Sequence, residues 1–256
     1  MAVFVTLASG SGGNSALFSD GSTHILVDAG ISFRRVREEL RRFDVRAEEL
    51  GAIFVTHEHI DHTRGLRQLL LHSRAPLYIT RGSASRLELP PEAEVRYIAA
   101  GERVAVGGVD VEIVATPHDT PESIGFVFEA CGRKFAYFTD IGEVTEAIRR
   151  AVLGVDCLFI EANHDVERLM CGSYPAYLKR RILGRGGHLS NADCAGLVCE
   201  AARAGTRRVT LCHLSKENNT PALAACAVLD ALAGAGQEEV RVCVAPPDRA
   251  CEPYIF

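Results

Sequence analysis

IFVTHEHIDHTRG, residues 53–65, ends an apolar run and then presents three histidines and an aspartate within six positions. His57 and His59 are two residues apart in an extended segment, so both side chains can point to the same side. Asp61 and His62 open the next predicted helix and can point elsewhere. A catalytic zinc takes about three protein ligands and keeps one position open for water. Four ligands divided two and two are too few for two ions, so the chain must supply more.

Three further candidate ligands follow apolar β-type runs: His118 in ATPHDT, Asp140 in AYFTD and His213 in TLCHLS. Residues at the ends of strands can meet at one edge of a sheet. Other catalytic motifs are excluded, because HExxH needs a histidine where Asp61 stands and neither GxxxxGK[ST] nor GxSxG occurs. The segment GSGGNS at 10–15 fails GxGxxG because a serine holds its last position.

The composition is that of a folded protein with a sizeable core, at 256 residues with 47% hydrophobic and 24% charged residues. The first apolar stretch spans only about six residues, too short for a signal or membrane segment, so we expect a cytoplasmic protein without membrane association. Nine cysteines, an odd number without a CxxC pair, favour free thiols over disulfides or a cysteine zinc site. Six lie in apolar runs and are expected to be buried: Cys157, Cys194, Cys199, Cys212, Cys226 and Cys243.

Arginine is clustered even though the net charge of −5 provides no global attraction to nucleic acid. The clusters lie at 34–42, 179–185 and 207–209. Each cluster is either a solvated helix face or a local phosphate-binding patch. A phosphate-binding patch is possible on an acidic protein because counterion release depends on the contacted patch rather than on the net charge.

Hydrophobic periodicity divides the chain into two halves, each with strands first and helices after. Strands are predicted at 3–9, 15–20, 24–29, 52–56, 76–80, 156–161, 207–212 and 239–244, with several more between 95 and 139 joined by hairpins at 106–109 and 130–133. Helices are predicted at 31–42, 62–72, 143–153, 174–184, 191–204 and 221–233. This order predicts two packed sheets with helices outside. Because no Gly-, Pro- or Ser-rich linker divides the halves, we predict one domain over residues 1–256.

The ligand pattern resembles the metallo-β-lactamase superfamily, and the resemblance covers nearly the whole chain. SGSGGNS (9–15), EANHD (161–165) with GHLSN (187–191), and HLSKENNTP (213–221) together resemble the YycJ/WalJ/VicX family of bacterial metallo-hydrolases, relatives of ribonuclease Z. The resemblance implies an α/β fold, a four-layer αββα sandwich of two mixed sheets with helices outside.

The resemblance also implies a centre with two divalent metal ions, zinc or manganese, which oxygen and nitrogen ligands suit equally. The implied ligands are His57, His59 and His118 for one ion, Asp61, His62 and His213 for the other, and Asp140 as the bridge between them.

His188 in GHLSN resembles the proton-donating histidine of ribonuclease Z-type enzymes, and Glu161 resembles the carboxylate that orients it. A leaving alkoxide needs a proton, and an imidazole needs a fixed tautomer. In the alternative interpretation GHLSN only caps a helix through Ser190 or Asn191. We predict catalytic roles for Asp61, His188 and Glu161.

Substrate contacts are predicted for Ser11, Asn14, His164, Ser190, Lys216 and Asn218. SGSGGNS is either a flexible turn or a loop whose N–H groups and side chains hold a phosphate. His164 contacts phosphate or metal, or else serves local structure, and SKENN (215–219) is either a helix lead-in or a substrate loop. His24 and His72 match no motif and are predicted to be structural or at the surface.

The predicted function is a dinuclear metal-dependent phosphodiester hydrolase, in which a metal-bridging hydroxide attacks phosphorus and His188 protonates the leaving oxygen. The family resemblance implies 5′-to-3′ exonuclease action on double-stranded DNA, bound through the local arginine clusters, with no required protein partner. The alternatives are a hydrolase of small or cyclic phosphodiesters, an RNA nuclease, and a thioester or lactam hydrolase. The non-enzymatic alternative is an accessory regulator of a cell-wall sensor-kinase system.

Overall fold

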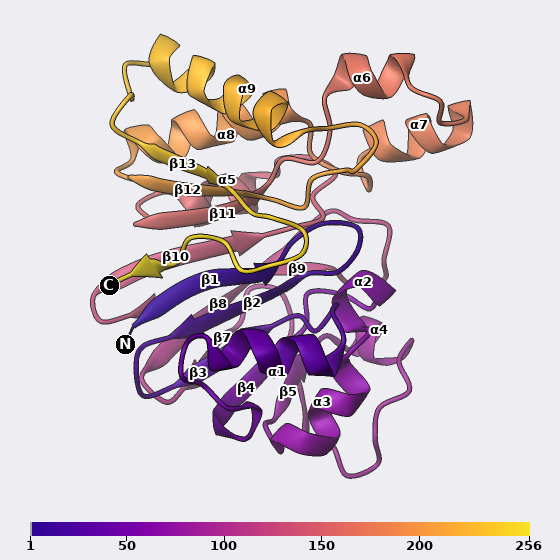
Figure 1. The fold of residues 1–256 in the computed structure, drawn as a ribbon, viewed down its shortest axis with the longest axis vertical. Coiled ribbons are helices and arrows are strands. Elements are labelled where there is room, and N and C mark those ends of the chain that lie inside the picture. Colours follow the sequence, from indigo (N-terminus) through magenta and orange to yellow (C-terminus); the bar gives the residue numbers. More distant parts are fainter. Residues whose placement is uncertain (1) are drawn as a thin grey trace.

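A computed structural model describes residues 2–256. Two seven-stranded mixed sheets pack face to face, and helices cover their outer sides (Figure 1). This arrangement is the predicted four-layer αββα sandwich, which is therefore confirmed.

The first sheet has the strand order β14-β1-β2-β3-β4-β5-β6, in which β1 to β6 come from the N-terminal half of the chain and β14 from its C-terminal end. Its strands are β1 (Val3–Ala8), β2 (Ser15–Ser19), β3 (His24–Val27), β4 (Leu50–Phe54), β5 (Leu77–Ile79), β6 (Val95–Tyr97) and β14 (Tyr254–Ile255). The strands β3 to β6 are parallel, and parallel neighbours need crossover connections. The helices α1 (Phe33–Arg41) and α3 (Leu66–Ser73) lie in two of these crossovers.

The second sheet has the order β13-β12-β11-β10-β9-β8-β7. Its strands are β7 (Arg103–Val106), β8 (Val109–Ala115), β9 (Ile124–Ala130), β10 (Arg133–Phe138), β11 (Cys157–Glu161), β12 (Arg208–Cys212) and β13 (Arg241–Val244). The predicted hairpins at 106–109 and 130–133 are confirmed by the antiparallel pairs β7–β8 and β9–β10. The helices of this half are α5 (Glu146–Val152), α6 (Val166–Cys171), α7 (Ala176–Leu183), α8 (Asn191–Arg203) and α9 (Pro221–Gly234).

Aromatic side chains join the two sheets. The ring of Phe4 on β1 lies 4.1 Å from that of Phe159 on β11, and Phe18 on β2 stacks on Phe128 of β9 at 4.9 Å. Each such pair buries a large apolar area and adds about 0.5–1.5 kcal/mol beyond it. The principal core is therefore shared by both sheets, which holds the strand ends of both halves in fixed positions along one edge.

The helix predicted at 62–72 is divided into α2 (Ile60–Thr63) and α3 in the structure. The break lies at Gly65, where a Cβ would stand 2.2 Å from the carbonyl oxygen of Ile31. The periodicity also missed the one-turn helix α4 (Arg81–Ala84), the helix α6 and the strand β14. The last of these exists only because it pairs with β1, a contact that local pattern does not encode.

All nine cysteines are free thiols, as predicted. Cys226 is exposed, contrary to the prediction, because α9 buries the face that carries Ala224, Val228 and Leu232, and Cys226 lies on the other side. Cys243 is half-buried. Within residues 2–256, no helix is long and apolar enough to cross a membrane.

Candidate metal centre

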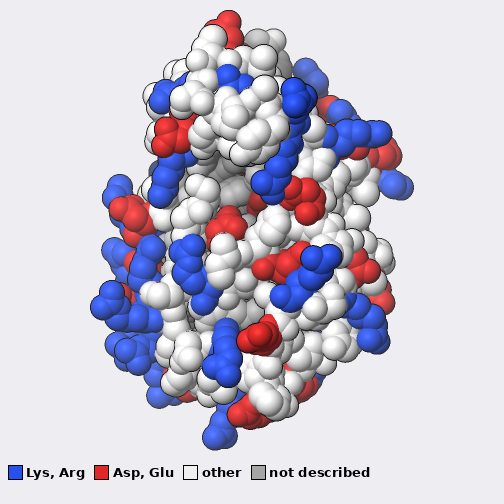
Figure 2. Space-filling model, turned by 90° about the vertical axis from the view of Figure 1, so that its right-hand side faces the viewer, with Lys and Arg blue, Asp and Glu red and all other residues white. Residues whose placement is uncertain are grey.

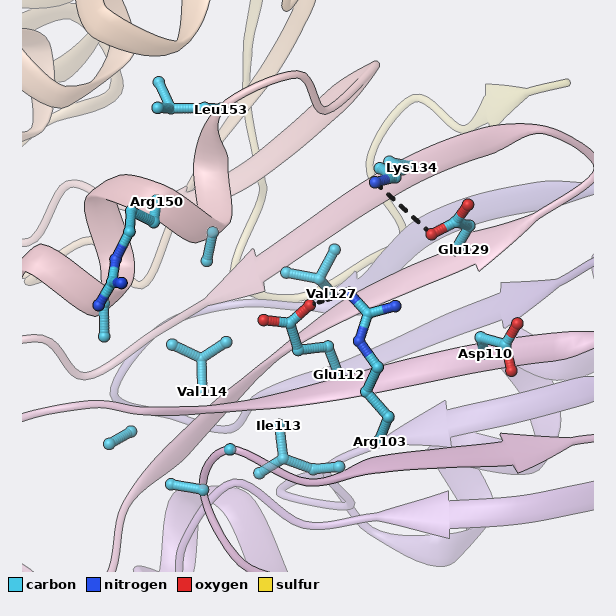
Figure 3. Close-up of a pocket in the computed structure, with 15 residues that line it drawn as sticks. Arg103, Asp110, Glu112, Ile113, Val114, Val127, Glu129, Lys134, Arg150 and Leu153 are labelled. Carbon is cyan, nitrogen blue, oxygen red and sulfur yellow. Dashed lines mark hydrogen bonds and ion pairs between the residues drawn. The ribbon is translucent and has the colours of Figure 1, made fainter.

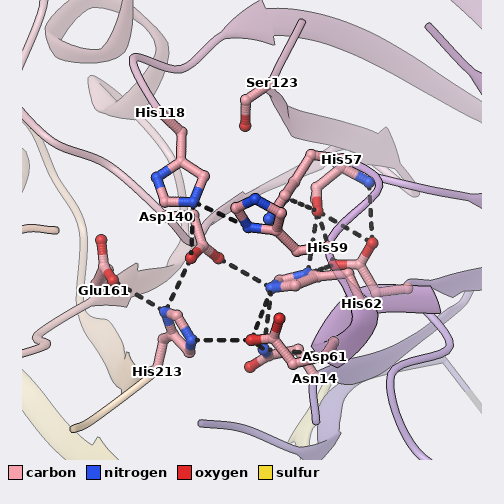
Figure 4. A network of polar contacts seen from close by, with 12 residues as sticks. Asn14, His57, His59, Asp61, His62, His118, Ser123, Asp140, Glu161 and His213 are labelled. Carbon is pink, nitrogen blue, oxygen red and sulfur yellow. Dashed lines mark hydrogen bonds and ion pairs between the residues drawn. The ribbon is translucent and has the colours of Figure 1, made fainter. Parts of the chain in front are cut away.

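The predicted ligands come from several strands that end at the same edge of the sandwich. His57 follows β4, His118 follows β8, Asp140 follows β10, and His213 directly follows β12. His59 caps the N-terminus of α2, so the chain turns into the helix between His57 and Asp61. Figure 4 shows these side chains converging on one small volume.

The ligand atoms form two triads, one of His57, His59 and His118 and the other of Asp61, His62 and His213, with all atoms of a triad within 4.8 Å of one another. Asp140 lies between them. Its Oδ2 is 3.0 Å from His62 Nε2, and its Oδ1 is 3.6 Å from His118 Nε2. The structure thus brings together all seven predicted ligands.

The site fits divalent metal ions on the evidence of its own buried atoms. His57 Nε2 and His213 Nε2 are buried, and neither has a hydrogen-bond partner among the described residues. A buried polar atom without a hydrogen-bond partner has lost its hydration without compensation, and this desolvation costs about 1–3 kcal/mol of stability. Bound cations would satisfy both nitrogens, and a set of imidazoles and carboxylates suits zinc or manganese.

Hydrogen bonds behind the ligands fix their tautomers. His118 Nδ1–H donates to the carbonyl oxygen of Gly187 (3.1 Å), and His213 Nδ1–H donates to Glu161 Oε1 (2.9 Å). Because both acceptors lack a proton to give, the lone pair of each ring is left on Nε2, which faces the centre. Such partners orient metal-binding histidines and raise their basicity.

Asp28 plays the same part for His62, and sequence reasoning missed it. The carboxylate is fully buried, accepts from His62 Nδ1–H at 2.8 Å, and also accepts from the amide and hydroxyl of Thr56 at 2.9 and 3.0 Å. The Thr56 hydroxyl in turn accepts from His57 Nδ1–H at 3.1 Å. The available signal was an acidic residue at the end of the apolar run HILVDA.

Glu161 holds two histidines at once. Its Oε2 accepts from the amides of Ile141 (2.7 Å) and Leu189 (3.2 Å), and its Oε1 accepts from His188 Nδ1–H (2.8 Å) as well as from His213. Burial opposes ionisation, but the two imidazoles bring the pKa of Glu161 down to about 2. Glu161 is therefore an ionised anchor shared by the second triad and His188.

The electrostatics of the centre favour a protonated His62 beside an ionised Asp140. Burial disfavours the charged His62 ring, but Asp28 and Asp140 outweigh it and raise its pKa to about 10. Burial likewise opposes ionisation of Asp140, whereas His213 and His62 hold its pKa well below the ordinary value. Burial dominates at His57, whose pKa is well below the usual value. The lowered pKa of Asp140 favours the ionised carboxylate, the form that binds a cation.

Three residues of the centre have strained backbones. Asp28, Asp140 and His213 have φ values of 59°, 57° and 53°, in the left-handed region that non-glycine residues rarely occupy. Such a conformation costs of order 1–3 kcal/mol and persists where the surroundings determine it. Each follows a strand end, so the turn redirects the side chain into the centre.

The loop SGSGGNS braces Asp61. The amide of Asn14 donates to the carbonyl oxygen of Asp61 (2.7 Å), and the Gly30 amide donates to that of Asn14 (2.8 Å). A Cβ on Gly30 would lie 1.6 Å from the Asp61 carbonyl oxygen, so only glycine fits there. Asn14 Nδ2 is also 3.0 Å from His62 Nε2. The loop therefore has a structural role beside any contact with substrate.

A cavity of about 360 Å³ opens onto the centre. His59, Asp61, His118, Asp140, His188 and His213 line its floor, and Ser11, Asn163, Tyr174, Leu178, Arg181, Ile182 and Lys216 line its walls. Of the predicted substrate contacts, the exposed side chains of Ser11 and Lys216 therefore lie where the prediction places them. Asp119, another wall residue, forms an ion pair with Arg181 at 2.6 Å.

The other four predicted substrate contacts are buried and do not line this cavity: Asn14, His164, Ser190 and Asn218. Ser190 caps α8, and Asn218 bonds Ser215. His164 is bridged to Ser190, and its two ring nitrogens have no partner among the described residues. These side chains were singled out by motif, but packing turns them inward.

A second cavity, of about 580 Å³, lies far from the histidines on the outer face of β7–β10 (Figure 3). Four of its charged side chains form two ion pairs, Arg103 with Glu112 and Lys134 with Glu129. His24 contacts Ser19, and His72 stacks on Phe33, so neither belongs to the centre.

Only one of the three arginine clusters borders the central cavity. Arg34 on α1 and Arg42 at its C-terminal end pair with neighbouring glutamates. Arg207 and Arg208 pair with Glu239 and Glu252. The cluster 179–185, on α7, contributes Arg181 to the cavity wall. Figure 2 looks onto this face, where Lys and Arg side chains flank a largely uncharged upper part.

Comparisons with known proteins agree with this geometry. A model of the β-lactamase superfamily domain matches residues 23–214. The exodeoxyribonuclease YycJ of Bacillus anthracis is 32% identical over 90% of this chain and 88% of its own length. The exodeoxyribonuclease WalJ of Streptococcus pneumoniae is 35% identical over 90% and 87%. The solved metallo-β-lactamase fold protein YhfI of Bacillus subtilis superposes with a TM-score of 0.74 at 16% identity, over 98% of this chain and 100% of that one.

The two-sheet sandwich with histidine and aspartate clusters at one edge defines a class of metal-dependent hydrolases. The chain belongs to the metallo-β-lactamase superfamily and, within it, to the YycJ/WalJ family. The family predicted from the sequence is therefore confirmed, and the clusters are sites for divalent metal ions.

Proposed function

We propose that the protein is a phosphodiester hydrolase with two metal ions, zinc or manganese, and that it degrades double-stranded DNA from the 5′ end. The observation that carries this proposal is the pair of ligand triads joined through Asp140. The names of the YycJ and WalJ relatives support DNA as the substrate. Because both sheets share one core, we also propose that residues 1–256 act as a single domain.

Two bound ions would supply Lewis acidity and lower the pKa of a water molecule from 15.7 to about 7. The chain's residues would hold them as the sequence implied, with His57, His59 and His118 on one ion, Asp61, His62 and His213 on the other, and Asp140 between. Asp61 also reaches the cavity surface, where its carboxylate can accept a hydrogen bond from the attacking water and orient it.

His188 would protonate the leaving oxygen. Its ring lines the cavity, and its Nδ1–H is engaged by Glu161, so Nε2 is the nitrogen left to act. Burial lowers the pKa of His188, but Glu161 outweighs burial and raises it above the ordinary value. A raised pKa favours the protonated ring, which is the form that a general acid needs before transfer. Ser11 and Lys216 on the cavity wall would contact the phosphate.

The deciding experiment uses protein reconstituted separately with zinc and with manganese. Duplex DNA labelled at the 5′ end should release labelled mononucleotides at once, whereas duplex labelled at the 3′ end should give a shortening ladder. Single-stranded DNA, RNA and a cyclic dinucleotide are compared in parallel, with Asp61→Ala as the inactive control. If neither metal form degrades duplex DNA while the cyclic dinucleotide is cleaved, the DNA assignment is wrong.

The size of the cavity favours one second candidate, a hydrolase of small or cyclic phosphodiesters. About 360 Å³ lies within the range of sites that enclose one small molecule. The same metal ligands would serve either substrate. The cyclic dinucleotide arm of the experiment separates the two candidates.

A further inference from the structure

The helices α6 and α7 form a hairpin that stands out from the body of the protein beside the cavity (Figure 1). No residue of α7 is buried, and α6 buries only Leu169. Globular proteins normally bury one apolar face of a surface helix. Here the side chains of Met170 and Tyr177 are 54% and 68% exposed. This hairpin therefore has apolar surface that its own chain does not cover.

The hairpin is also basic in an acidic protein. Residues 166–185 contain five basic side chains and one acidic one, Glu167, while the whole chain has a net charge of −5. Arg181 and Arg185 are paired with Asp119 and Glu143. Within residues 2–256 Arg180 has no ion-pair partner, and it is exposed. The uncovered surface thus combines an aromatic ring with a cation three residues away, on the same side of the helix.

The hairpin is held firmly against the cavity. Lys179 Nζ donates to the carbonyl oxygens of Met170 (2.6 Å) and Gly172 (2.8 Å), which ties α7 to the end of α6. Arg168 Nε donates to the carbonyl oxygen of Glu217 (2.9 Å), in the loop after His213. The other side of α7 supplies Leu178 and Arg181 to the cavity wall. A ligand that leaves the cavity on this side therefore runs along α7.

We propose that α7 is a binding platform for the unpaired end of a nucleic-acid strand, on which a base stacks on Tyr177 and a phosphate contacts Arg180. The proposal rests on the proposed function. A duplex is too wide for a cavity of about 360 Å³, so the strand must separate from its complement before its phosphate reaches the metal centre. Aromatic stacking on unpaired bases and cation contacts to the backbone are the means by which proteins hold single strands without sequence preference.

Charge favours this occupant over a protein partner. A partner with an ordinary mixed surface needs no excess of cations, whereas a strand carries one negative charge per nucleotide. The flat face of an unpaired base also suits the exposed ring of Tyr177. Strand binding that does not depend on Tyr177 or Arg180 would instead leave this surface to a protein partner.

The test compares Tyr177→Ala, Tyr177→Phe and Arg180→Ala with two controls at other exposed positions, Leu229→Ala on α9 and Arg34→Ala on α1. The probe is a fluorescent single-stranded phosphorothioate oligodeoxynucleotide, which resists hydrolysis, bound to the metal-loaded protein. Turnover of bis(p-nitrophenyl) phosphate is measured in parallel, because this small diester can occupy the cavity, whose lining does not include Tyr177 or Arg180.

Tyr177→Ala should weaken binding of the oligonucleotide by about 5- to 150-fold, and Tyr177→Phe should restore it. Arg180→Ala should reduce the slope of log K against log salt by about 0.7. Turnover of the small diester should stay within about twofold of the native value in both variants. If the native protein binds the strand and these variants bind it equally well, the platform is refuted while the proposed function stands. If the native protein degrades duplex DNA but binds no single strand, the platform is refuted and the proposed function again stands. If it degrades no duplex DNA yet hydrolyses the small diester, the DNA assignment fails, and the platform fails with it.

Discussion

Replacing Asp28 with asparagine removes one buried negative charge behind His62 while the size and shape of the side chain are kept. Asparagine tolerates the left-handed φ of 59° as well as aspartate does, so the backbone should stay in place. The amide oxygen can still accept from the Thr56 amide, now at 2.9 Å. The amide nitrogen, however, must face either the Thr56 hydroxyl or His62 Nδ1. A nitrogen that faces His62 cannot accept the hydrogen bond that His62 Nδ1–H donates to Asp28 Oδ2 at 2.8 Å in the native protein.

In the neutral ring, the form that binds a metal ion, the His62 proton would therefore lie on Nε2, the nitrogen that faces Asp140 and the metal centre. Loss of such a supporting partner typically costs 10–100-fold in metal affinity, about 1.4–2.7 kcal/mol. Titration of the metal-free protein with zinc and with manganese, followed by calorimetry, should show this loss at one of two sites, with the site of His57, His59 and His118 less affected. Asp110→Asn, on an exposed strand position, is the control. If Asp28→Asn is folded and binds both ions with native affinity, the assignment of Asp28 is wrong.

Three further predictions address the residues around the ligands. His188→Ala should lower kcat by about 10²–10⁴-fold with natural diesters, yet leave metal binding unchanged; an equal loss of metal would make it a ligand instead. Gly30→Ala should destabilise the fold by about 3 kcal/mol, measured by urea unfolding, because the Asp61 backbone blocks a Cβ. Since the pKa of Glu161 falls from 4.5 to about 2 on folding, its contribution to the stability of the metal-free protein is complete above about pH 4.5 and is lost as the pH falls through 2. The stability advantage of the native protein over Glu161→Gln should therefore shrink between pH 5 and 2, and a constant difference would contradict the assignment.

Much of the centre was predictable because the signals were local. The spacing of His57, His59, Asp61 and His62 follows from one strand end and one helix start, and the remaining ligands each close an apolar run. Neighbouring strands end at the same side of a sheet, so residues just after different strands can lie close together. The two-sheet architecture was predictable because the order of strands and helices along the chain is also a local signal.

The roles of the supporting residues depended on packing across the chain. Asp28 meets His62 and Glu161 meets His213 only once both sheets have closed on their shared core. The sequence motifs could not show that the side chains of His164, Ser190 and Asn218 are buried, because burial depends on every element packed around them.

The chemistry could be read from the amino-acid sequence, because HxHxDH and the strand-end ligands admit metal-assisted hydrolysis and little else. Which arginine cluster borders the cavity, and which helix is left uncovered beside it, depended on the folded structure. Ligand identity is a property of single side chains, whereas pairing and exposure depend on the neighbours that folding brings to them. Arg34 of α1 meets a glutamate on its own helix, whereas Arg180 of α7 is exposed to solvent.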